Sequence, residues 1–181
     1  MAKFDSYKEP LTKVLELVKE KTNLPRIVEY GPGGSTKLMK QIIPDSIIVT
    51  VENKLKWYNK YKEEFSRFKN NNLKIFYCKL SQDYVEKPSE VVDSNSADLI
   101  YIDGRQRVRC LRLAKELLKK KTGLIVLHDA ERKRYRPGYT DWPEKWRIWA
   151  GTKGHRTLIL VSNKADFEKL RSLEREAPKN R

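Results

Sequence analysis

Short apolar runs alternate with amphipathic segments along most of this chain. Residues 47–51 are β-branched almost throughout, which is typical of a parallel strand buried on both faces. Similar runs predict further strands at residues 26–30, 73–78, 97–103 and 124–127, and two short ones near 146–149 and 157–161. Strands that alternate with helices indicate an α/β fold, with a mostly parallel sheet covered by helices on both faces.

The segments between the predicted strands have the periodicity of helices. Apolar residues recur at helical spacing between positions 11 and 18, and Pro25 ends this segment because proline disfavours helix at the residue before it. A second helix is expected after the glycines near position 33, with Ser35 or Thr36 as its N-cap. Further helices are predicted at residues 55–68, 106–120 and 164–176. Residues 81–96 remain unassigned, and residues 130–145 are predicted to form a loop.

This order of elements predicts a single domain over residues 1–181, without an internal repeat or a linker. We divide it into an N-terminal helical segment (1–24), a Rossmann-like core (25–163) and a C-terminal helix with a frayed tail (164–181). The three tryptophans Trp142, Trp146 and Trp149 recur at helical spacing, and we expect them to pack on the core; the alternative is a lid over the site.

Composition adds a strong positive charge. The formal net charge is +15, and 35% of the residues are charged. A field of this sign attracts anions, so a nucleic acid, a nucleotide or a phosphorylated small molecule is an expected partner. The alternative interpretation is a lysine-rich surface without a specific ligand.

Other features bear on location. No apolar run approaches the roughly 18 residues of a membrane span, and the first five residues lack the apolar centre of a signal peptide. The two cysteines, Cys78 and Cys110, are too few for a disulfide framework and are expected to be buried thiols. We therefore expect a cytoplasmic protein without membrane contact.

Polar or glycine-rich segments follow all five predicted parallel strands. The carboxyl ends of parallel strands meet at one edge of a sheet, where ligands bind in folds of this class. We therefore expect these segments to line one crevice. They are residues 29–34, 52, 78–79, 103–104 and 128–129.

The first of these segments joins a strand to a helix through three glycines. Gly31, Gly33 and Gly34 allow backbone conformations that are closed to other residues, and they let a ligand approach closely. The following helix would point its free N–H groups to the same place. A nicotinamide fingerprint would need a glycine where Thr36 stands, so the loop indicates a different nucleoside ligand or merely a tight turn.

Glu52 ends the second predicted strand, about 20 residues after the glycine loop. An acid at this position can accept hydrogen bonds from both ribose hydroxyls of a bound nucleoside. Nicotinamide and S-adenosylmethionine sites share the spacing, so Glu52 indicates nucleoside binding without choosing between them. The alternative is an ordinary solvated acid at a strand end.

Four pieces of the sequence, taken in order, resemble a class I S-adenosylmethionine-dependent methyltransferase, and in particular a small bacterial branch of that superfamily. They span residues 28 to 135 and are Glu29 to Thr36, Val51-Glu52 with Trp57, Ile102 to Arg105 with Arg107, Val108 and Cys110, and His128-Asp129 with Arg132 and Tyr135. The resemblance implies a Rossmann-like three-layer αβα sandwich. Its mostly parallel sheet would have seven strands, the last of them antiparallel.

The resemblance also implies how S-adenosylmethionine would be held. Glu29, Gly31 and Gly33 would bind its methionine part, Glu52 its ribose, and Asp103 would face the reactive end. Lys79 departs from the family pattern, which often has an acid near the adenine, and Gln82 or Asp83 could take over that contact. The cofactor-binding residues expected from the sequence are Glu29, Tyr30, Gly31, Gly33, Gly34, Ser35, Glu52, Asn53, Gln82 and Asp103.

Asp103, His128 and Asp129 are the candidate catalytic residues, because they would lie on adjacent strand ends. His128 or Asp129 could act as general base on a hydroxyl or amine, or both could simply orient the loop backbone. The two aspartates could also hold a metal, as in the catechol-type O-methyltransferases that this region resembles. Ala130 stands where that family has an amide, so no metal is predicted. His155 is expected to be structural or on the surface.

Two arginine-rich clusters flank the expected crevice. One opens the helix at 106–120 and places Arg105, Arg109 and Arg112 on one face, and the other follows Asp129. Guanidinium groups bind phosphate and carboxylate with paired geometry, while cations at a helix start oppose the helix dipole. The clusters therefore predict an anionic acceptor, or else a solvated basic face. The residues expected to bind the acceptor are Arg105, Arg107, Arg132 and Tyr135.

The function predicted first is S-adenosylmethionine-dependent methyl transfer to an unidentified, anionic acceptor. Asp103-Gly104-Arg105 favours O-methylation or an unusual N-acceptor, because no Asn-Pro-Pro-Tyr-type motif ends the fourth strand. The alternative is a catalytically inactive methyltransferase-like module that binds nucleic acid, for which Lys79, Ala130 and the +15 charge are the arguments. Thr36 disfavours a nicotinamide-dependent oxidoreductase.

Overall fold

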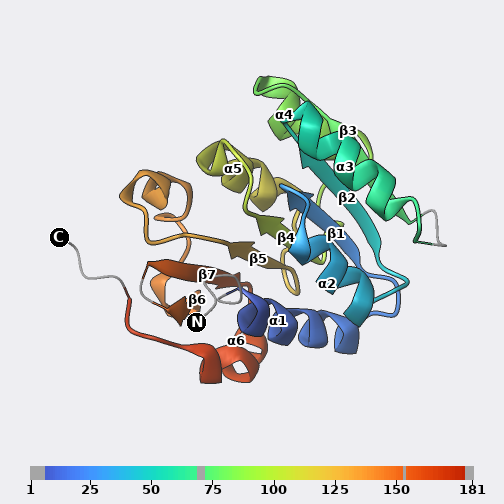
Figure 1. Cartoon of the computed structure of the whole chain (residues 1–181). Coiled ribbons are helices and arrows are strands. Elements are labelled where there is room, and N and C mark those ends of the chain that lie inside the picture. Colours follow the sequence, from blue (N-terminus) through green and yellow to red (C-terminus); the bar gives the residue numbers. More distant parts are fainter. Residues whose placement is uncertain (1–6, 69–71, 153, 178–181) are drawn as a thin grey trace.

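The computed structural model describes residues 7–68, 72–152 and 154–177, so the outermost parts of the predicted N-terminal segment and C-terminal tail lie outside the described residues. A central sheet lies between helices on its two faces (Figure 1). Its strands are β1 (Arg26–Tyr30), β2 (Ile47–Glu52), β3 (Leu73–Tyr77), β4 (Leu99–Ile102), β5 (Leu124–Leu127), β6 (Arg147–Thr152) and β7 (His155–Val161). The helices are α1 (Lys8–Lys21), α2 (Gly34–Ile42), α3 (Leu55–Phe65), α4 (Gln82–Glu86), α5 (Arg107–Leu117) and α6 (Lys164–Leu170).

The seven strands lie in the order β3-β2-β1-β4-β5-β7-β6. Strands β1 to β5 pair in parallel, and β7 runs antiparallel between β5 and β6. This confirms the Rossmann-like sandwich with its last strand antiparallel. The order reverses between β1 and β4, which places the switch point beside the glycine loop.

Apolar side chains cover both faces of the sheet, which explains why its central strands are apolar runs rather than alternating sequences. On one face, α1, α2 and α6 pack through residues such as Leu15, Met39 and Leu170. On the other face, α4 and α5 pack through Val85 and Leu111. Helix α3 lies next to α2, and an ion pair between Lys37 and Glu64 joins the two helices.

The predicted elements are confirmed, with differences at their ends. Strand β4 begins two residues later than expected, and directly before it the Asp98 carboxylate accepts from the Arg26 N–H at 2.9 Å and from Lys119 at 2.6 Å. Helix α3 ends at Phe65 instead of residue 68, and α6 ends at Leu170 before a 3₁₀ turn over 171–173. The unassigned segment 81–96 contains α4 and a 3₁₀ turn, and the expected loop 130–145 contains two 3₁₀ turns.

Two smaller expectations, for the cysteines and for the tryptophans, are also confirmed. Cys78 and Cys110 are buried free thiols. Trp142 and Trp149 pack against the core on one face of the sheet and Trp146 packs against the core on the other. Within the described ranges, no helix is both long and apolar enough to cross a membrane.

Candidate functional site

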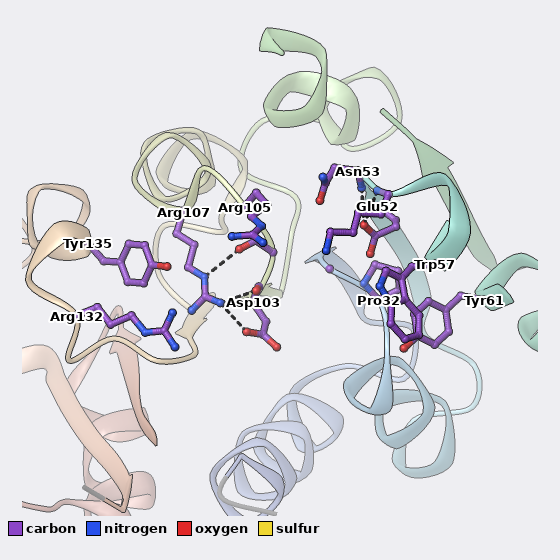
Figure 2. A pocket seen from close by; sticks show the side chains of 13 residues that line it. Pro32, Glu52, Asn53, Trp57, Tyr61, Asp103, Arg105, Arg107, Arg132 and Tyr135 are labelled. Carbon is purple, nitrogen blue, oxygen red and sulfur yellow. Dashed lines mark hydrogen bonds and ion pairs between the residues drawn. The ribbon is translucent and has the colours of Figure 1, made fainter. Parts of the chain in front are cut away.

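The carboxyl ends of β2, β1, β4 and β5 lie side by side at one edge of the sheet. The register pairs Tyr30 with Val51 on one side and with Ile102 on the other, and it pairs Ile102 with Leu127. A cavity of about 370 Å³ opens at this edge (Figure 2). Its walls are Gly31, Pro32, Glu52, Asn53, Lys54, Trp57, Tyr61, Asp103, Gly104, Arg105, Arg107, Arg132 and Tyr135.

The floor of the cavity is a close junction between the ends of β1 and β4. The Tyr30 carbonyl accepts hydrogen bonds from the N–H groups of Asp103 at 3.0 Å and Gly104 at 2.6 Å. Gly31 has φ +91°, and a Cβ there would lie 3.0 Å from the Gly104 backbone. Only glycine suits this position, because a side chain would be strained by the dihedral angle and would collide with β4's following loop.

Glu29 lies beneath the glycine loop and is fully buried. The hydroxyls of Ser35 and Thr36 donate to its two carboxyl oxygens, each at 2.6 Å, and the Thr36 hydroxyl accepts from the Gly33 N–H at 2.9 Å. Gly33, and not Ser35 or Thr36, is therefore the N-cap of α2, and Thr36 contributes to the cap from position N3 by accepting the Gly33 N–H. Glu29 and Ser35 support the loop from below and are not in the cavity wall.

Burial raises the pKa of Glu29 to about 7, although the hydroxyl hydrogen bonds oppose this shift. The cause is the cost of removing a charged carboxylate from water. The loop is therefore supported by a carboxyl group that changes charge near neutral pH.

Glu52, at the end of β2, lines the side of the cavity opposite Asp103 and is 8% exposed. The N–H groups of Asn53 and Lys54 both donate to its Oε1, each at 2.7 Å. Among the described residues no hydrogen bond occupies its other oxygen, Oε2. The carboxylate is thus fixed in orientation by the backbone and keeps an acceptor for a ligand.

An aromatic wall adjoins Glu52. The Trp57 ring is 38% exposed and stacks on Tyr61, with centroids 5.9 Å apart and planes 19° apart. The Lys60 ammonium lies 5.0 Å from the Trp57 centroid. Figure 2 shows Trp57 and Tyr61 beside Pro32 and below Glu52. A flat ligand can stack on this wall, because aromatic faces bind planar rings.

Asp103 and Arg107 form the β4 side of the cavity (Figure 2). The Arg107 guanidinium donates to the Asp103 carboxylate at 2.8 Å, to the Asp103 carbonyl at 2.6 Å and to the Gly104 carbonyl at 3.0 Å. It also donates to the carbonyl of His128 at the end of β5. Burial raises the pKa of Asp103, and the neighbouring His128 and Arg107 only partly oppose this. Arg107, predicted to bind the acceptor, therefore mainly ties two strand ends together.

Asp129 lies behind the cavity and is 8% exposed. Its Oδ2 is 2.5 Å from Arg132, and its Oδ1 is 3.4 Å from His128 Nε2 and 3.6 Å from His155 Nδ1. The other His128 ring nitrogen faces the Thr157 hydroxyl at 3.4 Å. Both ring nitrogens of His128 therefore face protein groups, and Asp129 serves to position Arg132 in the cavity wall. His155, which we expected to be structural or on the surface, contributes to this cluster.

The structure brings together eight of the residues predicted from the sequence in one cavity wall: Gly31, Glu52, Asn53, Asp103, Arg105, Arg107, Arg132 and Tyr135. Tyr30 is buried, with its hydroxyl on the Val85 carbonyl at 2.7 Å, and Gly33 and Gly34 also lie outside the wall. Gln82 lies outside too, because its amide donates to Glu86 one turn along α4.

Sequence reasoning missed Lys54 and Tyr61 as cavity residues and gave Trp57 no role. Tyr61 could have been found from its spacing, because it follows Trp57 by one helical turn. In the described part of the chain, no group of three His, Cys, Asp or Glu side chains is placed to hold a metal ion.

Comparisons with known proteins bear on the fold. No protein-family model and no curated protein matches the sequence. Among solved structures, a precorrin-6y C5,15-methyltransferase from Geobacter metallireducens has a TM-score of 0.63 and 13% identity, covering 91% of this chain and 93% of that one. An O-methyltransferase from Bacillus cereus in complex with S-adenosylhomocysteine (SAH) has a TM-score of 0.63 and 18% identity, with coverages of 83% and 80%. The chain thus has the fold of the class I S-adenosylmethionine-dependent methyltransferases.

Gly31→Ala tests the junction of β1 and β4. We expect a loss of about 2 kcal/mol in the free energy of unfolding, because the substitution combines a strained φ with a backbone collision. Gly33→Ala is the matched control, since a Cβ there would make ordinary contacts with the Tyr61 side chain, at 3.5 Å from its hydroxyl and 3.9 Å from Cζ. Urea denaturation measures both, and equal losses in the two variants would contradict the assignment.

Glu29→Gln tests the buried carboxyl group. Its pKa rises from 4.5 to about 7 on folding, so the stability it contributes is fully present below pH 4.5 and is lost as pH rises towards 7. A shift of this size corresponds to about 3 kcal/mol. We expect the wild type to lose up to that amount relative to the variant between pH 5 and 7.5, measured by urea denaturation in the same buffers. Parallel stability curves would show that Glu29 does not titrate in this range.

Proposed function

We propose that the chain is a methyltransferase that binds S-adenosylmethionine in the cavity at the β1–β4 switch point and transfers its methyl group to an anionic acceptor. The observation that carries the proposal is one cavity with Glu52 at one end, Asp103 at the other and the Gly31 turn between them. The fold supports it, because ligands of such sheets bind at this edge.

The residues present fit the cofactor. Glu52 Oε2 is available to accept from the ribose hydroxyls while Oε1 remains bound to the backbone. Trp57 offers a face next to Glu52 on which the adenine can stack. This stacking would replace the contact with an acid that the family often has near the position of Lys79. The glycine turn lets the methionine part lie against the backbone towards Asp103. Both acids at the cavity ends suit a ligand with cationic groups.

When bound, the cofactor supplies an electrophilic methyl group that needs little activation, so the protein mainly positions the acceptor. Asp103 is the group placed to take the acceptor's proton: it lines the cavity, and its raised pKa favours proton uptake. Arg107 fixes the Asp103 side chain through its hydrogen bond at 2.8 Å. Arg105 and Arg132 line the same cavity and would pair with a negative group of the acceptor.

Glu52→Gln tests the cofactor site. The amide can still accept the Asn53 and Lys54 N–H bonds through its oxygen, but it replaces the Oε2 acceptor with a donor. We expect SAH affinity, measured by isothermal titration calorimetry, to fall by about tenfold or more.

Glu63→Gln is the matched control, because Glu63 is an exposed acid of α3 that does not line the cavity. Absence of SAH binding by the wild type would refute the cofactor assignment. Equal affinities of the wild type and Glu52→Gln would refute the ribose contact alone.

Trp57→Ala tests the aromatic wall. Stacking of a base on an aromatic side chain contributes about 1–3 kcal/mol, so we expect SAH affinity to fall by roughly tenfold. Trp57→Phe should restore most of it, because a ring face remains. If Trp57→Ala bound SAH as tightly as the wild type, the adenine would have to lie elsewhere in the cavity.

A further inference from the structure

A second hollow of about 270 Å³ lies next to the cofactor cavity and shares part of its wall. Both are lined by Arg105, Arg107 and Tyr135, and only the second also includes Arg109 and Arg134. Its side chains come from the start of α5 and from the 3₁₀ turn over 133–138, which lie far apart in the sequence. Arg105, Arg109 and Arg112 were predicted to share one helix face. Arg105 and Arg109 line the hollow, and Arg112 does not.

The hollow holds positive charge that nearby acids do not neutralise. Among the residues that the structure describes, no Asp or Glu lines it. Arg107 is the exception among its arginines, because it pairs with Asp103 at 2.8 Å. In the described ranges Arg105, Arg109 and Arg134 have no carboxylate within ion-pair distance. All three are exposed, and Arg105 and Arg109 flank the N-terminus of α5, where a cation opposes the helix dipole.

Two of these three guanidinium groups, those of Arg109 and Arg134, have neutral hydrogen-bond partners. Arg109 donates to the Gln106 side-chain oxygen at 2.6 Å, and Arg134 donates to the Tyr135 hydroxyl at 3.0 Å. The Tyr135 ring also lies 4.9 Å from the Arg107 guanidinium and 5.0 Å from that of Arg134. Orientation without charge neutralisation leaves these arginines able to bind an anion.

The geometry points to a phosphate-binding subsite in this hollow, with Arg109 and Arg134 as its principal ligands and Arg105 shared with the cofactor cavity. Three unmatched guanidinium groups suit a phosphate, which offers more oxygens and more charge than a carboxylate. This subsite rests on the proposed function and specifies the acceptor. The acceptor would carry a phosphate in addition to the group that is methylated. The phosphate belongs either to a phosphorylated small molecule or to a nucleic-acid backbone.

The experiment uses the double variant Arg109→Gln/Arg134→Gln, with Arg112→Gln as matched control because Arg112 is exposed on α5 outside the hollow. Inorganic phosphate is titrated by calorimetry into SAH-saturated protein at constant ionic strength. We expect the double variant to lose about tenfold in phosphate affinity, as for lost charge-assisted hydrogen bonds, and Arg112→Gln to behave as wild type. Absence of phosphate binding by the wild type, or equal affinity in the double variant, would overturn the subsite.

A second arm identifies the source of the phosphate. A ten-nucleotide single-stranded oligonucleotide without terminal phosphate is titrated into the same proteins by fluorescence anisotropy. If the double variant loses affinity for both phosphate and the oligonucleotide, the subsite binds a nucleic-acid backbone phosphate. If it loses affinity for phosphate but binds the oligonucleotide as the wild type does, the subsite binds the phosphate of a small molecule. SAH affinity should be equal in wild type and double variant. If the wild type does not bind SAH, the cofactor proposal fails, whatever the phosphate titration shows.

Discussion

The junction between β1 and β4 is the constraint on which the site depends. The Tyr30 carbonyl accepts from two consecutive N–H groups of the β4 loop, and Gly31 and Gly104 come so close that a Cβ on Gly31 would lie 3.0 Å from the Gly104 backbone. This contact brings the glycine loop and Asp103 into one cavity, although they lie about 70 residues apart along the chain. The hydroxyl-bound Glu29 below and the Arg107 guanidinium beside it hold the two loops in register.

The walls of the cavity carry charges of both signs. Its two acids are Glu52, which is fixed by backbone N–H groups, and Asp103, which is fixed by Arg107. Lys54 and three arginines line the same cavity, and of the arginines there and in the adjoining hollow only Arg107 and Arg132 pair with acids in the described residues. Under the proposed function, the acids would face the cationic cofactor and the unpaired arginines would face an anionic acceptor.

Periodicity and strand-end chemistry predicted the parallel α/β core and much of the cavity, because both depend on features that are local in the sequence. The antiparallel direction of the last strand was implied by the resemblance to the methyltransferases. The apolar runs predicted strands β1 to β5. The residues directly after these strands meet at one edge of the sheet, because the strands are parallel. The roles of individual side chains were harder to predict, because they depend on contacts between distant elements. Arg107, which was expected to bind a ligand, lines the cavity and also hydrogen-bonds two strand ends, and His155 lies near Asp129 because β7 inserts beside β5.

A crystal structure of the protein with SAH would show directly whether this cavity holds the cofactor. We predict the ribose hydroxyls on Glu52 Oε2, the adenine against the Trp57 ring, and the methionine part along Gly31 towards Asp103. SAH bound with its ribose away from Glu52, or at another surface of the molecule, would contradict this prediction.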